Sequence, residues 1–386
     1  MSKIITVFAL FFSLLSSGQA QKNVVRLPIE IWNEEILLKV MVNDIEGTFI
    51  WDNGFTITGI DSAFAEKCNL SKPKGKLLAT DGNNKKVELV EGKCKKISLG
   101  TFEEKNTKII VLNTYNFTQT KSKAIDGLIG TTIINEYNWY FNFDSSFVEI
   151  SKKPFSNKGL ELPFKIIGGS LNHQIDLTIN GYEAPCRIDF GYNSDDIIMN
   201  IKGAAYFQNN KASEAYGITS FSVSGASQMD TSYIVKDNYT FKIANQNLGF
   251  LPKVSISPIH NNINLGNKFF INKFNVTINC KDKKYILSER KMPEKLNSDK
   301  SYGLKILLID NKFYIGKLSL NPNIKDKKLA LMQEVAEING KTHKDLIDNY
   351  FLLKYQKDIL NNNEKMVLKM ANGTIYEFMP EYDEER

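Results

Sequence analysis

The chain has 386 residues, of which 42% are hydrophobic and 11% aromatic, so it can bury a sizeable core and wholesale disorder is excluded. Lys and Arg number 49 against 43 Asp and Glu, which gives a net charge of +6 at pH 7. This small excess is interspersed and forms no block of like charge, so a nucleic-acid partner is not predicted. A chain of this length commonly folds as two or three domains.

The N-terminus has the pattern of a secretory signal peptide. Lys3 supplies a positive charge, residues 4–15 form an apolar run, and small residues lead to Ala20. The apolar run is too short to span a membrane, and no later stretch reaches the roughly 18 apolar residues that a spanning helix needs. We therefore expect residues 1–20 to be a signal peptide. The mature protein should be exported to a periplasm or to the extracellular space, without a transmembrane segment.

An internal repeat occurs at a constant offset of 137 residues. Residues 38–43 and 175–180 share the alternating pattern of a β-strand, and both end at an Asn before a turn. The next strand of each copy ends in an Asp-x-Gly triplet. Residues 134–142 match residues 271–279 at the same offset, with five of nine positions identical or exchanged between Tyr and Phe. Two matches that flank a shared triplet indicate a duplicated domain.

The four cysteines predict two disulfides, because the count is even and the protein is expected to be exported. Two cysteines fall in each copy of the repeat, so we expect the pairs Cys68–Cys94 and Cys186–Cys280. Buried free thiols are the alternative. The three histidines lie far apart in the sequence and show no ligand spacing, so neither a metal site nor a histidine-based triad is predicted.

Short strand-like runs with glycine turns dominate residues 22–290, and long helical periods do not occur there. We expect each copy to be a small closed or sandwiched β-barrel. After a polar link, strand-like runs at 303–309 and 313–318, a helix around 343–353 and a hairpin turn at Asn372-Gly373 predict a smaller mixed α+β domain. The three expected domains span residues 21–155, 156–292 and 300–386.

Asp52 and Asp189 end an apolar strand at the same place in the two copies. In a roughly two-fold molecule these carboxyl groups can share one proton, because two like charges about 3 Å apart cannot both ionise cheaply. The ionised member can then activate a water, while the protonated member polarises a peptide carbonyl. Asp52 and Asp189 are therefore the candidate catalytic residues, and this chemistry requires neither a metal nor a cofactor.

These residues resemble the aspartic proteases of the pepsin and retropepsin type, in the single-chain form with two lobes. The first copy has the triplet at Asp52 and Gly54 and an Asp-Gly-Leu-Ile-Gly stretch at 126–130, and the second copy repeats the triplet at Asp189 and Gly191. The resemblance implies a mainly β protein with duplicated, retropepsin-like β-barrel lobes. It also implies hydrolysis of peptides or unfolded proteins, favoured at acidic pH, with the two glycines permitting tight turns behind the carboxyl groups.

The same resemblance implies a flap, a β-hairpin that closes over the substrate. The candidate flap residues are Thr80, Asp81, Gly82, Asn83 and Asn84. A looser counterpart in the second copy lies at residues 222–226.

The residues that follow the two aspartates depart from the family pattern. The family has Thr or Ser there, whose hydroxyl braces the site across the lobes, whereas this chain has Asn53 and Phe190. Asn can donate and accept hydrogen bonds, but the Phe side chain can do neither. A lost brace could displace the carboxyl groups by the ångström that lowers the rate roughly 100-fold. Two hypotheses therefore remain: an exported aspartic endopeptidase, or a catalytically inactive relative that binds peptides or proteins in the cell envelope.

The C-terminal region resembles a PDZ domain. Tyr302, Gly303 and Leu304 form a candidate carboxylate-binding loop that leads into a strand, and residues 335–341 are similar to that family's Ile-Asn-Gly stretch. The resemblance implies that a peptide C-terminus adds as a strand to the sheet edge. The alternative is a small structural domain.

Overall fold

The computed structural model describes residues 23–70, 75–200, 202, 207, 211–235, 239–291, 300–319 and 321–382. The predicted signal peptide lies outside these residues. The protein is mainly β, as the sequence predicted. Among the described residues, no helix is both long and apolar enough to cross a membrane.

The first β unit comprises residues 24–151. Its elements are β1 (Val24–Trp32), β2 (Glu35–Val42), β3 (Ile45–Trp51), β4 (Gly59–Asp61), α1 (Ser62–Lys67), β5 (Gly75–Thr80), β6 (Lys86–Leu99), β7 (Phe102–Leu112), α2 (Tyr115–Thr118), β8 (Gly127–Ile129), α3 (Thr131–Ile134), β9 (Asn138–Asn142) and β10 (Phe147–Ser151).

The second β unit comprises residues 160–289. Its elements are β11 (Leu160–Pro163), β12 (Lys165–Ile166), β13 (His173–Ile179), β14 (Tyr182–Asp189), β15 (Ile197–Met199), β16 (Lys211–Ile218), β17 (Phe221–Ser222), β18 (Gly225–Ala226), β19 (Met229–Val235), β20 (Phe241–Ile243), β21 (Val254–Ile256), β22 (Ile263–Gly266), α5 (Asn267–Ile271), β23 (Phe274–Asn279) and β24 (Lys284–Glu289).

The same strand topology occurs in both units. In the first, β2 pairs antiparallel with β3, β3 parallel with β8, β8 antiparallel with β4, and β4 parallel with β7. In the second, β13, β14, β22, β15 and β21 repeat this order with the same directions. β9 and β23 pair antiparallel and join the two units in one sheet. This correspondence places the ends of β3 and β14, where Asp52 and Asp189 lie, in equivalent positions.

The main core is continuous across both units, and aromatic side chains fill much of it. Alternate residues in and around β9 point inward: Tyr137, Trp139, Phe141 and Phe143 are all buried. Trp51, which precedes Asp52, is fully buried and packs edge-on against Trp139 at a centroid distance of 5.6 Å. The strand that carries Asp52 is therefore anchored in the core.

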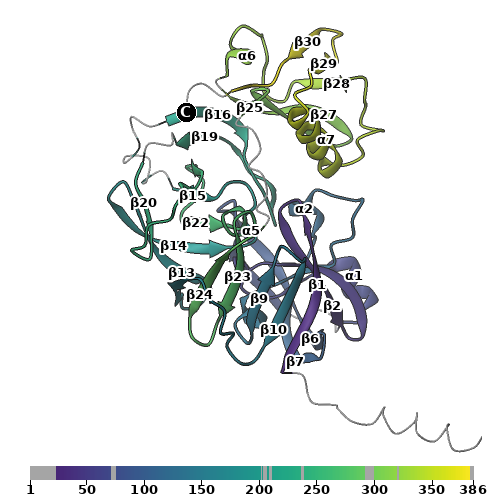
Figure 1. Cartoon of the computed structure of the whole chain (residues 1–386). Helices are drawn as coiled ribbons and strands as arrows, with labels where there is room; N and C mark the ends of the chain where they lie inside the picture. The colour runs from purple at the N-terminus through teal and green to yellow at the C-terminus, as the bar shows by residue number, and fades with distance from the viewer. Residues whose placement is uncertain are drawn as a thin grey trace, which may run out of the picture.

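The C-terminal module comprises residues 300–382 and has a core of its own. Its elements are β25 (Lys300–Ser301), β26 (Leu304–Ile309), β27 (Lys312–Ser319), α6 (Pro322–Lys325), β28 (Glu334–Ile338), α7 (Asn349–Asn361), β29 (Met366–Met370), β30 (Ile375–Phe378) and β31 (Glu381–Tyr382). Figure 1 shows this module, in yellow and yellow-green, next to β16 of the second unit and α2 of the first. β27 pairs antiparallel with β16, so the module continues the second unit's sheet.

The predicted disulfides are wrong, because all four cysteines are free and buried. Cys94 Sγ donates to Lys96 O at 3.0 Å, while Cys280 Sγ points at Ile134 O at 3.6 Å. A buried free cysteine behaves as a small hydrophobic residue. Long strand ladders and a shared core already hold both units together. The presence of two cysteines in each copy of the repeat therefore did not indicate that they form disulfides.

Candidate active site

Asp52 and Asp189 lie at the C-terminal ends of β3 and β14, and each is followed by a tight turn. Asp52 Oδ1 accepts a hydrogen bond from Gly54 N at 2.8 Å, and Asp189 Oδ1 accepts one from Gly191 N at 3.1 Å. The two turns are equivalent, because the strands before them repeat the same parallel pairing. Each carboxyl group is thereby fixed by the backbone of its own triplet.

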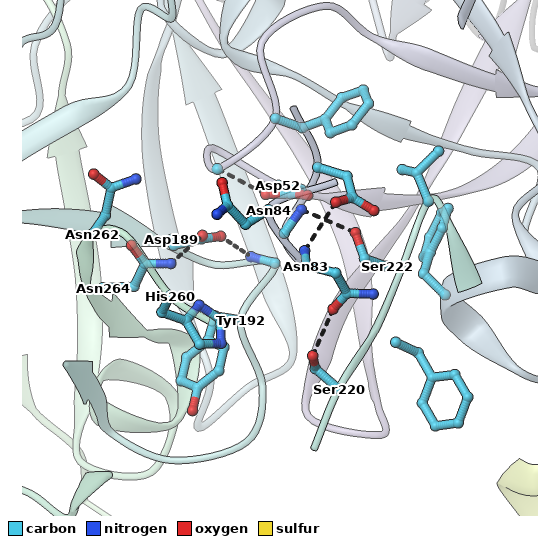
Figure 2. Close-up of a pocket in the computed structure, with 18 of the residues that line it drawn as sticks. Asp52, Asn83, Asn84, Asp189, Tyr192, Ser220, Ser222, His260, Asn262 and Asn264 are labelled. Carbon is cyan, nitrogen blue, oxygen red and sulfur yellow. Dashed lines mark hydrogen bonds between the residues drawn. The ribbon is translucent and has the colours of Figure 1, made fainter. Parts of the chain in front are cut away.

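Each carboxyl group packs against the glycine of the other triplet. A Cβ atom added to Gly191 would lie 2.5 Å from the carboxyl atoms of Asp52, and one added to Gly54 would overlap the carboxyl group of Asp189. Figure 2 shows the two aspartates facing the same cavity. The structure thus brings the two predicted catalytic residues together and explains why both turns need glycine at this position.

Asn53 forms the brace between the two triplets. The side chain is fully buried, and its Oδ1 accepts a hydrogen bond from Phe190 N at 2.8 Å. The Phe190 ring instead packs in the core and stacks on Phe270 at a centroid distance of 4.8 Å. The Asn53 side chain therefore contributes a hydrogen bond between the triplets, whereas the Phe190 side chain contributes only apolar packing.

A chain of buried hydrogen bonds continues from this brace. Asn53 Nδ2 donates to Tyr285 Oη at 3.0 Å, Tyr285 Oη lies 2.6 Å from His173 Nδ1, and His173 Nε2 lies 2.7 Å from Asn135 Oδ1. Asn135 Nδ2 donates to Leu171 O, so its Oδ1 is the acceptor, which requires that His173 carry its proton on Nε2. Burial lowers the pKa of His173 to about 3, so the ring is neutral. The sequence did not predict this series of hydrogen bonds, because the residues that form it lie far apart in the sequence.

Asp189 accepts two further hydrogen bonds, both from side chains of the second unit. Arg187 Nη2 donates to Asp189 Oδ2 at 2.7 Å, and Asn264 Nδ2 donates to the same oxygen at 3.0 Å. Arg187 Nε also bonds Asn264 Oδ1 at 3.2 Å, which orients both side chains. With the Gly191 N–H, three N–H donors surround Asp189, an arrangement that suits an ionised carboxylate. Sequence reasoning did not identify Arg187 or Asn264.

The carboxyl groups of Asp52 and Glu35 favour the protonated form. Burial, and then the charge of Asp189, raise the pKa of Asp52 above its ordinary value. Glu35 also lines the cavity, and burial followed by the charge of Asp52 raises its pKa to about 8. Its Oε1 accepts a hydrogen bond from Asn193 Nδ2 at 3.1 Å. In mildly acidic solution Asp52 and Glu35 therefore favour the carboxylic acid form.

Two hairpin tips meet over the aspartates. The flap tip, residues 80–84, joins β5 to β6, and all five predicted flap residues line the cavity. The opposing tip, residues 220–226, carries β17 and β18 between β16 and β19. Hydrogen bonds connect the tips: Gly82 N to Ser222 Oγ at 3.0 Å, Asn83 Nδ2 to Gly225 O at 2.9 Å, and Ser224 N to Asp81 Oδ2 at 3.1 Å. Figure 2 shows Asn83, Ser220 and Ser222 in this contact.

Residues 38–133 match the family model of aspartyl proteases. Over this stretch the chain is aspartic-protease-like. The match contains Asp52, Gly54 and the flap tip, and it stops before Asp189. No curated protein matches the chain. The predicted relationship to aspartic proteases is thus confirmed for the first copy of the triplet.

The aspartic-protease-like site opens into a cavity of about 310 Å³. Its two halves differ in chemistry. The half that belongs to the first unit includes Ile50, Phe55, Phe117 and Leu128 beside Glu35 and the flap tip, and the half that belongs to the second includes Arg187, Tyr192, His260, Asn262 and Asn264 beside Phe221, Val223 and Ile259. A peptide that crosses the aspartates would therefore meet a group of four apolar side chains on one side and the Arg187–Asn264 pair on the other.

The predicted peptide-binding loop of the C-terminal module leads into β26, and this strand is already paired on both edges. Gly303 has a φ of +78°, between buried Tyr302 and the first residue of β26, Leu304. The β26 edge that faces α7 is occupied by two side-chain amides. Asn349 bonds both the N–H and the carbonyl of Leu308, and Gln356 does the same for Ile306. A peptide strand could add there only by displacing both amides. Binding of a peptide at this loop stays a prediction.

Proposed function

We propose that this protein is an aspartic endopeptidase with two pepsin-like lobes, in which Asp52 and Asp189 form the catalytic dyad. The observation that supports this most is the crossed packing of the two carboxyl groups, each against the glycine of the other triplet. The closed hairpin tips add a roof that can exclude water from a bound peptide. The hydrogen bonds of the site also assign a role to each aspartate.

Asp189 is the general base in this mechanism. Two N–H donors occupy its Oδ2, while Oδ1 accepts one backbone N–H and keeps one acceptor position for a water. Asp189 removes a proton from that water as the oxygen attacks the peptide carbonyl, and Asp52 transfers its proton to the carbonyl oxygen. The tetrahedral intermediate then collapses: the C–N bond breaks, Asp189 returns its proton to the leaving nitrogen, and Asp52 regains one from the intermediate's hydroxyl.

The second candidate is the inactive relative that binds peptides. The Arg187–Asp189 ion pair favours it, because a guanidinium 2.7 Å away occupies one oxygen of the carboxyl group that would have to act as the base. The cavity and hairpin tips would serve binding equally well.

Cleavage of casein from pH 3 to 8, with and without pepstatin, separates the two functions. The endopeptidase should cut, and Asp52→Asn and Asp189→Asn should each reduce the rate at least 100-fold, because each removes one half of the proton transfer. Asp61→Asn is a matched control: Asp61 caps α1 and lies outside the cavity lining, so this variant should still cut. A folded parent that cuts nothing at any pH would favour the binder.

We further propose that residues 1–20 direct export to a periplasm or the extracellular space, and that residues 300–382 form a PDZ-like module. The order of β26, β27, β28, α7, β29 and β30 and the glycine turn before β26 support the second point. The side chains of Gln356 and Asn349 already hydrogen-bond the edge of β26 that faces α7, so an external peptide or C-terminus would have to displace them.

A further inference from the structure

The duplicated topology allows the two walls of the cavity to be compared position by position. Ile50 and Arg187 stand two residues before the two aspartates, and each shares the face of its strand with the aspartate because side chains alternate. Leu128 and Asn264 stand two residues before the glycines that follow at equivalent points of β8 and β22. All four line the cavity. The two units therefore share the frame but differ at both wall residues, which are apolar in the first half and polar in the second.

The first half can hold an apolar side chain. Ile50 and Leu128 belong to one apolar cluster with Phe55 and Phe117. Phe55 and Phe117 are only partly buried, so a substrate side chain placed against them would remove further apolar surface from water. None of these four residues offers a side-chain hydrogen bond. A polar substrate group packed against these four side chains would lose its water without a replacement from them.

The second half offers a cation. Of the described residues that line the cavity, Arg187 alone carries a permanent positive charge. Its side chain is 23% exposed, and its bonds to Asp189 and Asn264 use two of the five N–H groups of a guanidinium. The other three have no partner among the residues that the structure describes. A guanidinium can hold a second carboxylate through its remaining edge while it keeps the first.

Among the described residues, Asp189 is the one carboxylate of the cavity lining that the structure pairs with Arg187. His260 is neutral above about pH 4, because burial lowers its pKa to about 4. Asp52 and Glu35 favour their protonated forms, and the carboxylate of Asp81 is held by backbone N–H groups of both hairpin tips. An acidic side chain that enters the second half therefore finds one strong partner within reach.

We infer that the cleft selects peptides with an apolar side chain on one side of the scissile bond and an acidic side chain on the other. The cleavage part of this inference rests on the proposed function. The binding preference would hold equally for a protein that binds such peptides without cutting them.

Fluorogenic peptides that differ only in their central pair test the inference at pH 6, where a glutamate side chain is ionised. The pairs are Leu-Leu, Leu-Glu, Glu-Leu, Leu-Gln and Gln-Leu. One of the two orders with Glu should be cleaved with a kcat/KM at least tenfold above both Leu-Leu and its own Gln counterpart, as a charge-assisted hydrogen bond would provide. Arg187→Ile gives the second half the residue type that Ile50 has in the first. This variant should cleave the Leu-Leu peptide with a higher kcat/KM than the peptide with Glu.

Arg26→Ile is the matched control, because Arg26 is an exposed arginine of β1 paired with Glu149. It should leave the ratio unchanged. Cleavage with Leu-Leu as the best substrate, or an unchanged ratio in Arg187→Ile, would overturn the inference while the endopeptidase stands. If nothing is cleaved, non-cleavable reduced-amide analogues of the same peptides are titrated by calorimetry. A Glu preference that Arg187→Ile abolishes would then support the inference for a binder, and its absence would overturn it.

Discussion

The base of the site shows how single residues replace the family's hydroxyl brace. The amide of Asn53 accepts the N–H of Phe190 and continues into the buried chain through Tyr285 and His173. Phe190 contributes stacking instead of a hydrogen bond, since its ring lies against Phe270. Where the family has a second hydroxyl, Phe190 therefore contributes core packing, and the Asn53 amide supplies the hydrogen bond between the triplets.

Glu35 makes the stability of the protein depend on pH. Its folded-state pKa of about 8 lies above the ordinary value of 4.5. The stability that its neutral form contributes is therefore complete below pH 4.5 and is lost as the pH rises through 8. Gln cannot ionise and keeps an acceptor for Asn193 Nδ2, so Glu35→Gln should be more stable than the parent by a few kcal/mol above pH 8. Urea unfolding at pH 4.5, 6.5 and 8.5 measures this difference.

The control for this prediction is Glu30→Gln, at an exposed glutamate paired with Lys123. Its unfolding free energy should follow the parent's at all three pH values to within about 1 kcal/mol. If Glu35→Gln and the parent showed the same pH dependence, Glu35 would not be protonated in the folded protein.

The two aspartates were predictable because each lies at the end of a strand whose copy stands 137 residues away. Arg187 was not proposed, although the signal was present: residues two apart on a strand share a face, so Arg187 had to lie beside Asp189. The position of Asn264 in the site depends on the parallel register of β14 and β22, which places it opposite Arg187. Such a long-range register cannot be read from a local pattern.

At the scale of elements, local signals placed strands better than helix ends. The Asn372-Gly373 turn correctly predicted the pairing of β29 with β30. The helix expected around 343–353 begins instead at Asn349, because Asp348 caps it by accepting a hydrogen bond from Phe351 N at 3.0 Å. The sequence could not show that α7 turns its amides onto β26, since that contact depends on how helix and sheet dock.

Gln356→Leu should open the β26 edge. The variant leaves the N–H and carbonyl of Ile306 without their partner in a partly buried groove, so the free energy of unfolding should fall by about 1–3 kcal/mol. Hydrogen exchange at the Ile306 amide should become faster. Lys354→Leu is the control on the exposed face of the same helix, where the lysine pairs with Asp358. Equal exchange at Ile306 in the two variants would show that Gln356 does not protect the edge.

At the scale of the whole molecule, the C-terminal module contacts both β units. On the first, Asp348 accepts hydrogen bonds from Lys121 N at 2.8 Å and Ser122 N at 3.1 Å, and Tyr350 stacks on Trp32 at a centroid distance of 4.7 Å. On the second, β27 pairs with β16, which is one arm of the hairpin that carries the opposing tip. The module is therefore attached to a strand that leads directly to the roof of the cavity.

Gly217 makes the contact with β16 possible, and its replacement should release the module from the hairpin. Its φ is +143°, and an added Cβ would lie 2.6 Å from Lys317 Cα, so Gly217→Ala must push β27 away. Hydrogen exchange should become faster at 215–217, at 317–319 and at the opposing tip. Gly340→Ala is the matched control: its φ is +76° with open space around it, so it adds backbone strain of order 1–3 kcal/mol without a clash. If Gly217→Ala changed exchange at the opposing tip no more than Gly340→Ala, pairing with β27 would not be what holds the hairpin over the cavity.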